Sequence, residues 1–169
     1  MTNTFLEKLH PGFSQTIELS GSPIVEEKSQ FQNIRIFDSK RNGRVLVLDD
    51  IVQLTTRDEC GYSEMLTHLP ALEHGNVREV MIAGGGDMAI AEEMLKHRGV
   101  KTVFNVEIDE RVVDLSRRHL SEVNAAAFAD PRLKVQIEDA FVFLADKANQ
   151  HRFDLIIADR PDPVGPAEV

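Results

Sequence analysis

The sequence predicts an α/β protein in two parts: a small antiparallel β-hairpin domain over residues 1–56, then a Rossmann-like domain over residues 57–169. Three observations support this. Apolar and polar residues alternate with period two in the first third of the chain. Strand-like and helix-like patterns then alternate, which is typical of a parallel sheet. Finally, the glycine cluster Gly84–Gly86 follows an apolar run, and the acid Glu107 closes the next apolar run roughly twenty residues later.

The first part consists of short alternating runs between Phe13 and about Thr56. These runs cover residues 16–19, 34–37, 44–48 and 51–54. Turn residues separate them, at Gly21-Ser22-Pro23, Asn42-Gly43 and Asp49-Asp50. The pattern predicts a small antiparallel sheet of hairpins.

The second part begins with a predicted helix over residues 57–72, on which Tyr62, Met65, Leu66 and Leu69 recur at helical spacing. Strands are then predicted at 79–83, 102–108, 133–137 and 153–158, and helices at 89–97, 110–120 and 140–147. A parallel sheet binds ligands at the carboxyl ends of its strands. The glycines, Glu107, Asp139 and Asp159 all fall at such ends.

The last predicted strand, residues 153–158, is apolar, and the Rossmann-like domain is incomplete at its C-terminal side because the sequence ends soon after this fourth parallel strand. An exposed apolar strand promotes aggregation unless something covers it. We therefore expect a homo-oligomer, a partner chain or further sequence of the protein to cover it.

Composition restricts the class of protein. A net charge of −9 with no basic patch argues against a nucleic-acid partner. No apolar run approaches the ~20 residues that cross a bilayer, and the first residues do not resemble a signal peptide. The single Cys60 agrees with a reducing compartment, so we expect a cytoplasmic protein. The histidines lack the spacing of a zinc site, and no metal is expected.

Acidic and glycine residues at the strand ends suggest a nucleoside site. Gly84 and Gly86 let the backbone approach a ligand closely, and Glu107 can accept hydrogen bonds from two ribose hydroxyls. Asp139 can accept a hydrogen bond from the exocyclic amine of adenine, while the backbone N–H of Ala140 can donate to a ring nitrogen. The alternative is that Asp139 only caps the helix that begins at Ala140.

Two further carboxylates, Asp159 and Asp162, lie on a proline-rich segment directly after the last strand. A partly desolvated carboxylate at Asp159 can accept a proton from an ammonium nucleophile, and Asp162 can anchor a cation. The alternative is an ordinary turn, because Asp and Pro are turn residues.

Several motifs occur in a fixed order: LVLDDIVQLTTRDECGYSEMLTHLPALEHGN, IAGGGD, VEID, AFADPRLKVQIEDA and DRPDPVGPAE. Over residues 5–169 the chain resembles the polyamine aminopropyltransferases, especially the bacterial spermidine synthases. The resemblance implies an N-terminal β-hairpin domain and a methyltransferase-like Rossmann domain. It also implies aminopropyl transfer from decarboxylated S-adenosylmethionine to putrescine, which gives spermidine and methylthioadenosine, with no metal.

The resemblance implies a role for each matching residue. On the amine side these are the base Asp159, the diamine anchor Asp162, Asp87 at the amine and aminopropyl end, Tyr62 beside the diamine, and Ser63 at a substrate contact. On the nucleoside side they are Gln32, Gln53 near the thioether, the ribose-binding Glu107, the adenine pair Asp139 and Ala140, and Pro166 in the pocket wall.

The chain departs from the family pattern near the expected site. Met88 stands where glycine is usual, and we expect its side chain to enter the space between Asp87 and Asp159. Ser63 replaces a histidine of the bacterial relatives, and Arg160 places a cation between two carboxylates. Asp50 stands where a turn glycine is usual.

These departures leave a second hypothesis, a catalytically impaired relative that binds a nucleoside or polyamine as a partner or regulatory subunit. A third hypothesis is a methyltransferase that uses ordinary S-adenosylmethionine. An acidic pocket near the sulfonium would repel the carboxylate of that substrate, which disfavours the third.

Overall fold

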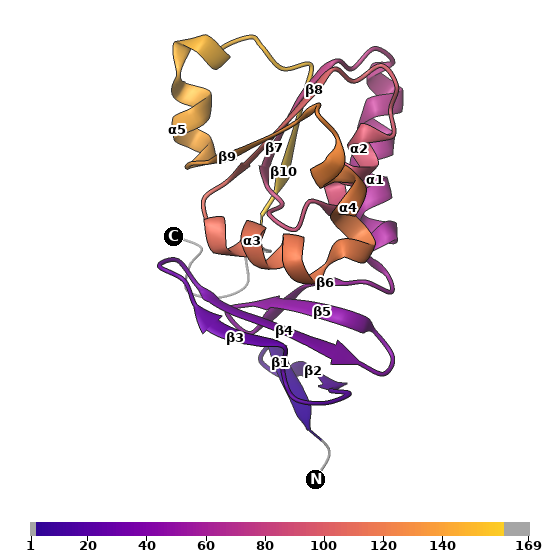
Figure 1. Ribbon diagram of the computed structural model, residues 1–169, viewed down its shortest axis with the longest axis vertical. Helices are drawn as coiled ribbons and strands as arrows, with labels where there is room; N and C mark the ends of the chain where they lie inside the picture. The colour runs from indigo at the N-terminus through magenta and orange to yellow at the C-terminus, as the bar shows by residue number, and fades with distance from the viewer. Residues whose placement is uncertain (1–2, 161–169) are drawn as a thin grey trace. The chain divides into compact units, whose positions relative to one another are not determined.

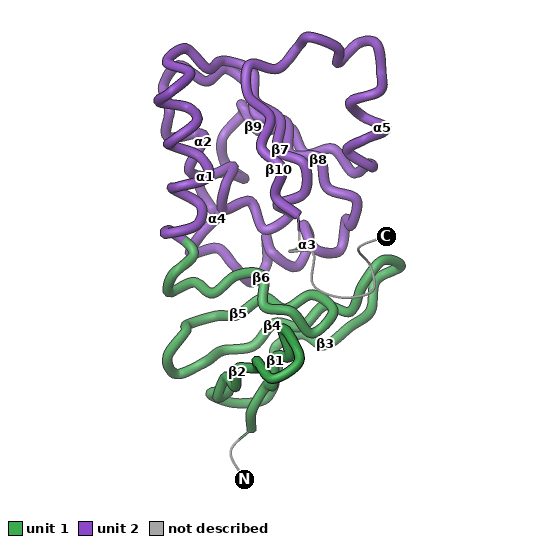
Figure 2. The backbone as a smooth tube through the Cα atoms, turned by 180° about the vertical axis from the view of Figure 1, so that it is seen from behind, with its two compact units in different colours: residues 1–59, 161–169 green, residues 60–160 purple. Residues whose placement is uncertain are grey.

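The computed structural model describes residues 3–160 of the chain. The described chain divides into two compact units, residues 3–59 and 60–160, which are coloured separately in Figure 2. Each unit has its own sheets and its own hydrophobic core. The predicted site residues Asp162 and Pro166 lie outside the described residues.

The first unit is built from antiparallel strands, as predicted. Strands β1 (Thr4–His10) and β2 (Phe13–Glu18) form one hairpin. A second sheet has the order β3-β4-β5-β6, with β3 at Val25–Lys28, β4 at Asn33–Ser39, β5 at Gly43–Leu48 and β6 at Ile51–Thr55. The hydrophobic core of this first unit lies between the two sheets' strands and includes Phe5, Ile17, Phe37, Val45 and Val47.

Strand β1 was not predicted, because a charged residue occupies one of its buried positions. Glu7 is buried on the same face of β1 as Phe5. Its carboxylate accepts hydrogen bonds from the Val52 backbone N–H (2.7 Å) and from the Gln15 side chain. A buried carboxylate with such partners replaces an apolar residue and breaks the apolar alternation that identifies a strand.

The β5–β6 hairpin turns at two aspartates in the left-handed region, Asp49 with φ 46° and Asp50 with φ 63°. Two consecutive positive φ angles are typical of a type I′ turn, which favours glycine at its second position. Asp49 Oδ1 accepts hydrogen bonds from the backbone and side-chain nitrogens of Asn33, both at 2.8 Å. Both aspartates have a left-handed backbone, and Asp50 occupies the position where glycine is favoured.

The second unit contains the predicted parallel sheet, with strand order β10-β7-β8-β9 (Figure 1). These strands are β7 (Glu79–Gly84), β8 (Thr102–Glu107), β9 (Leu133–Ile137) and β10 (Leu155–Asp159). The helices are α1 (Glu59–His74), α2 (Ala89–Leu95), α3 (Glu110–His119), α4 (Ser121–Ala129) and α5 (Ala140–Ala145), followed by a 3₁₀ turn at Lys147–Asn149.

The two faces of the sheet are covered by different helices: α1, α2 and α4 lie on one side and α5 on the other (Figure 1). Each face of this sheet has its own hydrophobic cluster, and the side chains of β7 alternate between them. Val80 and Ile82 pack with α2, while Met81 packs with Phe143 of α5. Strand β10 is at one edge, and in the described part of the chain its outer side has no strand partner.

Helix α1 differs from the expectation in the face that it buries. Its buried residues are the small side chains Ser63, Thr67 and Ala71. Of the four apolar residues that marked the helix in the sequence, Leu66 packs against the core, while Tyr62, Met65 and Leu69 are each more than half exposed. Small residues allow a helix to approach its neighbours closely, so most of the buried face of α1 consists of small side chains.

Helix α4 was missed because its run of alanines shows no contrast between apolar and polar faces, and because it follows α3 after one residue, Leu120. It is anchored to α2, since Glu92 Oε2 accepts hydrogen bonds from the backbone N–H groups of Ala126 (3.0 Å) and Ala127 (3.1 Å).

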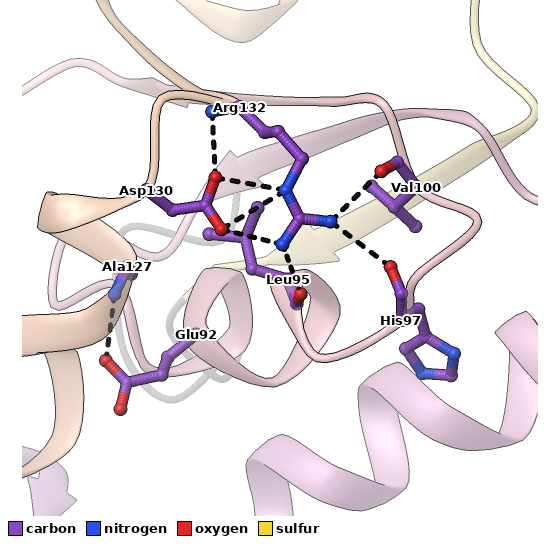
Figure 3. A network of polar contacts seen from close by, with 7 residues as sticks. All are labelled: Glu92, Leu95, His97, Val100, Ala127, Asp130 and Arg132. Carbon is purple, nitrogen blue, oxygen red and sulfur yellow. Dashed lines mark hydrogen bonds and ion pairs between the residues drawn. The ribbon is translucent and has the colours of Figure 1, made fainter.

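Figure 3 shows how the chain after α2 is fixed by Arg132. Its guanidinium donates to the carbonyl oxygen of Leu95 (2.5 Å), the last residue of α2, and to those of His97 (3.3 Å) and Val100 (3.0 Å) in the segment that follows. Asp130 pairs with the same guanidinium at 2.6 Å, and this hydrogen bond lowers the pKa of Asp130 below its ordinary value. Among the described helices, none is long and apolar enough to cross a membrane.

Candidate active site

The carboxyl ends of the four parallel strands bring together the residues that the sequence singled out. Gly84 ends β7, Glu107 ends β8 and Asp159 ends β10, while Asp139 lies just beyond the end of β9. Gly84 is the register partner of Asp159 on the neighbouring strand. The strand-end rule therefore places these groups at one edge of the sheet, as expected.

The three glycines are required by contacts with this edge. A Cβ on Gly84 (φ 82°) would lie 1.9 Å from the carbonyl oxygen of Asp159. A Cβ on Gly85 (φ 65°) would lie 2.9 Å from Asp159 Oδ2, and one on Gly86 would lie 3.0 Å from Glu107 Oε2. The turn thus passes directly against two carboxylates. Gly85, which was not a predicted site residue, belongs to the turn as much as its neighbours.

Asp159 is the carboxylate that the site surrounds most closely. The hydroxyl of Tyr62, on α1, donates to Asp159 Oδ1 at 2.9 Å. Burial raises the pKa of Asp159 above its ordinary value, and the Tyr62 hydrogen bond opposes that rise by favouring the ionised form. A carboxylate with a raised pKa is a better proton acceptor than an ordinary one.

Glu107 is a second buried acid, 8% exposed. Desolvation raises its pKa, while the backbone N–H of Asp109, 2.9 Å from Oε1, opposes the rise. Asp109 in turn caps α3 by accepting a hydrogen bond from the Arg111 N–H at 3.0 Å. The two acids at the end of β8 therefore have different roles: Asp109 caps α3, and Glu107 lies against Gly86.

Met88 is not in the position that the sequence predicted. Its side chain is completely buried in the hydrophobic core with Ile82 and Ile90, so the expectation that it enters the space between Asp87 and Asp159 is wrong. The backbone explains the usual glycine, since Met88 has φ 69° at the residue before α2. Asp87, the residue before it, is half-buried, and its Oδ1 accepts a hydrogen bond from the Ala89 N–H at 2.8 Å.

Asp139 caps a helix, which was the structural alternative to a ligand-binding role. It is the N-cap of α5, and its Oδ1 accepts a hydrogen bond from the Phe141 N–H at 2.7 Å. A carboxylate has two oxygens and about four acceptor positions, so this bond leaves capacity for a second partner. Ile108, Ile137 and Phe141 are large apolar side chains left exposed near these strand ends, and sequence reasoning did not identify them.

Other predicted residues lie elsewhere. Gln32 is in the turn between β3 and β4 of the first unit, where its carbonyl accepts the Ser29 N–H at 2.9 Å. Gln53 is on β6 of the same unit, and its Nε2 donates to the Ile51 carbonyl at 3.2 Å. Ser63 is on the buried face of α1 and is 2% exposed. Their roles in a site stay predictions.

Comparison with known proteins shows the family of this chain. Residues 59–169 match the spermine/spermidine synthase domain, and residues 5–56 match the spermidine synthase tetramerisation domain. The chain belongs to the spermidine synthase family. The resemblance to polyamine aminopropyltransferases that the sequence motifs indicated is confirmed.

Similar family members include the polyamine aminopropyltransferases of Hamiltonella defensa, 43% identical over 96% of this chain and 55% of the relative, and of Ruegeria sp., 45% identical over 96% and 56%. A crystal structure of spermidine synthase with the transition-state analogue AdoDATO aligns with a TM-score of 0.88 and 32% identity, over 95% of this chain and 54% of that one. The Thermotoga maritima spermidine synthase gives 0.87 and 31%, over 93% and 54%. The chain spans about half the length of these spermidine synthase relatives.

Proposed function

We propose that this chain transfers an aminopropyl group from decarboxylated S-adenosylmethionine to putrescine, which gives spermidine and methylthioadenosine. The observation that carries the proposal is Asp159, a carboxylate of raised pKa that lies against the glycine turn and is held by Tyr62. Curated relatives are polyamine aminopropyltransferases, and a related spermidine synthase binds a transition-state analogue of its reaction.

The reaction needs a proton acceptor close to the attacking amine. An alkylamine with a pKa near that of lysine, about 10.4, is almost wholly protonated at neutral pH and has no lone pair to attack with. In our proposal Asp159 accepts the proton. The nitrogen then attacks the aminopropyl carbon bonded to the sulfonium. The new C–N bond forms as the C–S bond breaks. The electron pair of the C–S bond stays on sulfur, which becomes the neutral thioether of methylthioadenosine.

The nucleoside half of the proposed site uses Glu107 for the ribose hydroxyls, with Asp139 and the Ala140 amide for adenine. Glu107 is held by the Asp109 N–H and lies against Gly86, so its orientation is fixed before a ligand binds. Exposed apolar side chains at the same strand ends, such as Ile108 and Ile137, suit the faces of a purine ring. Gln32, Gln53 and Pro166 complete this half in the proposal.

The amine half uses Asp87 and Asp159, with Tyr62 beside them and Asp162 as the anchor of the distal ammonium. Carboxylates around both ends of a diamine orient it for attack along the C–S axis. The same charges would repel the carboxylate of ordinary S-adenosylmethionine, which supports decarboxylated substrate over a methyltransferase reaction.

The second hypothesis, a relative that binds ligand without catalysis, loses one of its reasons. It depended partly on Met88 blocking the amine channel, and Met88 is in the core. The substitution at Ser63 remains in its favour, because this small side chain is buried rather than open to a substrate.

We also propose that the protein acts as a homo-oligomer. Residues 5–56 match a domain described as the spermidine synthase tetramerisation domain. An exposed free thiol at Cys60 is consistent with a reducing, cytoplasmic setting.

Isothermal titration with methylthioadenosine tests the nucleoside half. We expect the wild-type chain to bind, and Glu107→Gln to weaken binding by about 1–3 kcal/mol because a charged acceptor of two hydroxyls is lost. The matched control is Glu110→Gln, which removes the same charge from an exposed position three residues away. The proposal fails if the wild type does not bind, or if the two variants bind equally well.

A further inference from the structure

Two asparagine side chains donate hydrogen bonds to the main chain of the glycine turn. Asn105, on β8, donates from Nδ2 to the carbonyl oxygens of Gly84 (2.8 Å) and Gly85 (3.2 Å). Asn124, on α4, donates from Nδ2 to the carbonyl oxygen of Asp87 (2.9 Å). Asn105 therefore holds the start of the turn and Asn124 its end.

Both side chains are completely buried, and each keeps one polar atom without a hydrogen-bond partner among the described residues, Asn105 Oδ1 and Asn124 Oδ1. A buried acceptor without a partner destabilises the fold, because it has lost its hydrogen bonds to water. An apolar residue of similar size would avoid this loss, but it would also take the donor away from the carbonyls that each amide now contacts. Packing alone therefore does not explain an asparagine at either position, and such groups call for an explanation.

The turn that they hold has little freedom to move without disturbing the carboxylates. A Cβ placed on Gly85 would lie 2.9 Å from Asp159 Oδ2 and 3.5 Å from Asn105 Nδ2, so Gly85 is close to both side chains. The Gly85 carbonyl also accepts the Met88 N–H at 3.0 Å, so Asn105 and the left-handed Met88 converge on one oxygen. A displacement of the turn at Gly85 would therefore press on Asp159.

At the other end, the Asn124 amide ties the turn to the end of a neighbouring helix. Its Nδ2 donates at 3.0 Å to the Ser116 carbonyl of α3 as well as to Asp87. Asp87 is the acid that our proposal places at the amine and aminopropyl end of the substrate. Its backbone is thus held by Asn124 while its Oδ1 accepts the Ala89 N–H.

We propose that Asn105 and Asn124 are positioning residues, an asparagine clamp that fixes the glycine turn so that Asp87 and Asp159 keep the separation aminopropyl transfer needs. This inference rests on the proposed function. Reacting groups misplaced by about 1 Å can lose about 100-fold in rate, so a clamp of this kind acts on turnover more than on folding.

The decisive variant is Asn105→Leu, which keeps the size of the side chain and removes its amide. Thermal unfolding, methylthioadenosine affinity, and kcat and KM for putrescine are measured on the full chain. Relief of the unpaired Oδ1 is offset by loss of the two bonds to the turn, so we expect the unfolding midpoint to change by no more than about 4 °C. We expect kcat to fall about 10- to 100-fold, with a smaller change in the affinity for methylthioadenosine.

Asn149→Leu is the matched control. Asn149 is also buried in the second unit, and its Nδ2 also donates to a main-chain carbonyl, that of Phe143 at 2.9 Å, but at α5 rather than at the turn. We expect this control to keep the wild-type kcat. The clamp is overturned if both variants change kcat equally, or if Asn105→Leu turns over normally.

Amide hydrogen exchange separates failure of the clamp from failure of the proposed function. If the wild type neither binds methylthioadenosine nor turns over, the proposed function fails, and exchange at the Met88 and Ala89 amides decides the clamp. Faster exchange there in Asn105→Leu, with Val80 and Ile82 unchanged, supports it, and unchanged exchange overturns it. If Asn105→Leu does not fold, Asn124→Leu is given the same tests. Failure of both to fold shows a purely structural role.

Discussion

Replacing Met88 by glycine tests where its side chain lies. Met88 is completely buried, in the core that also contains Ile82 and Ile90, and its backbone has φ 69°. The substitution therefore has two opposing effects on the free energy of unfolding. Loss of a buried methionine side chain costs about 2–5 kcal/mol. Relief of the left-handed backbone returns about 1 kcal/mol. We expect a net destabilisation of about 1–4 kcal/mol.

Urea unfolding followed by circular dichroism measures this difference, with Met88→Ala as the control. Alanine removes nearly as much of the side chain but keeps the strained backbone, so it should be the less stable of the two variants by about 1 kcal/mol. Titration with putrescine should show no gain in affinity for Met88→Gly. A glycine variant more stable than the wild type, or one that binds putrescine more tightly, would refute the placement of Met88 in the core.

Two further changes test the turn of the first unit and the electrostatics of the second. Asp50→Gly should raise the free energy of unfolding by about 0.5–1 kcal/mol, because φ 63° suits glycine. Loss of the Asp50–Arg35 ion pair (3.8 Å) should cost little because the pair is exposed, and a drop in the unfolding midpoint would contradict this. Tyr62→Phe removes the hydroxyl that favours ionised Asp159, so the pKa of Asp159 should rise further. Because the base must be ionised to accept a proton, the acid limb of kcat/KM should move to higher pH, and an unmoved limb in the pH–rate profile would disprove the role of this contact.

The sequence predicted the parallel sheet and the acids at its edge because both depend on local pattern. Apolar runs ending in glycine or acid mark the carboxyl ends of strands, and the topology of a parallel sheet then brings those ends together. Glu107 and Asp159 could therefore be assigned to one edge without knowledge of any contact between them.

Features that depend on long-range contacts were not predictable in this way. Strand β1 was hidden by Glu7, whose burial depends on a hydrogen bond to Val52, 45 residues away in the sequence. Asn105 looks like an interruption of an apolar strand until the Gly84 carbonyl above it is known. The position of Met88 follows from a left-handed backbone that residue identity alone does not reveal.

The central claim is that Asp159 deprotonates the amine in aminopropyl transfer, and one measurement tests it most directly. The full chain is incubated with decarboxylated S-adenosylmethionine and putrescine, and spermidine and methylthioadenosine are quantified for the wild type and for Asp159→Asn, which keeps the shape of the side chain. We expect equal amounts of the two products from the wild type, and a fall in kcat of roughly 10²–10⁴-fold in the variant with little change in methylthioadenosine affinity. Near-normal turnover by Asp159→Asn would contradict the account.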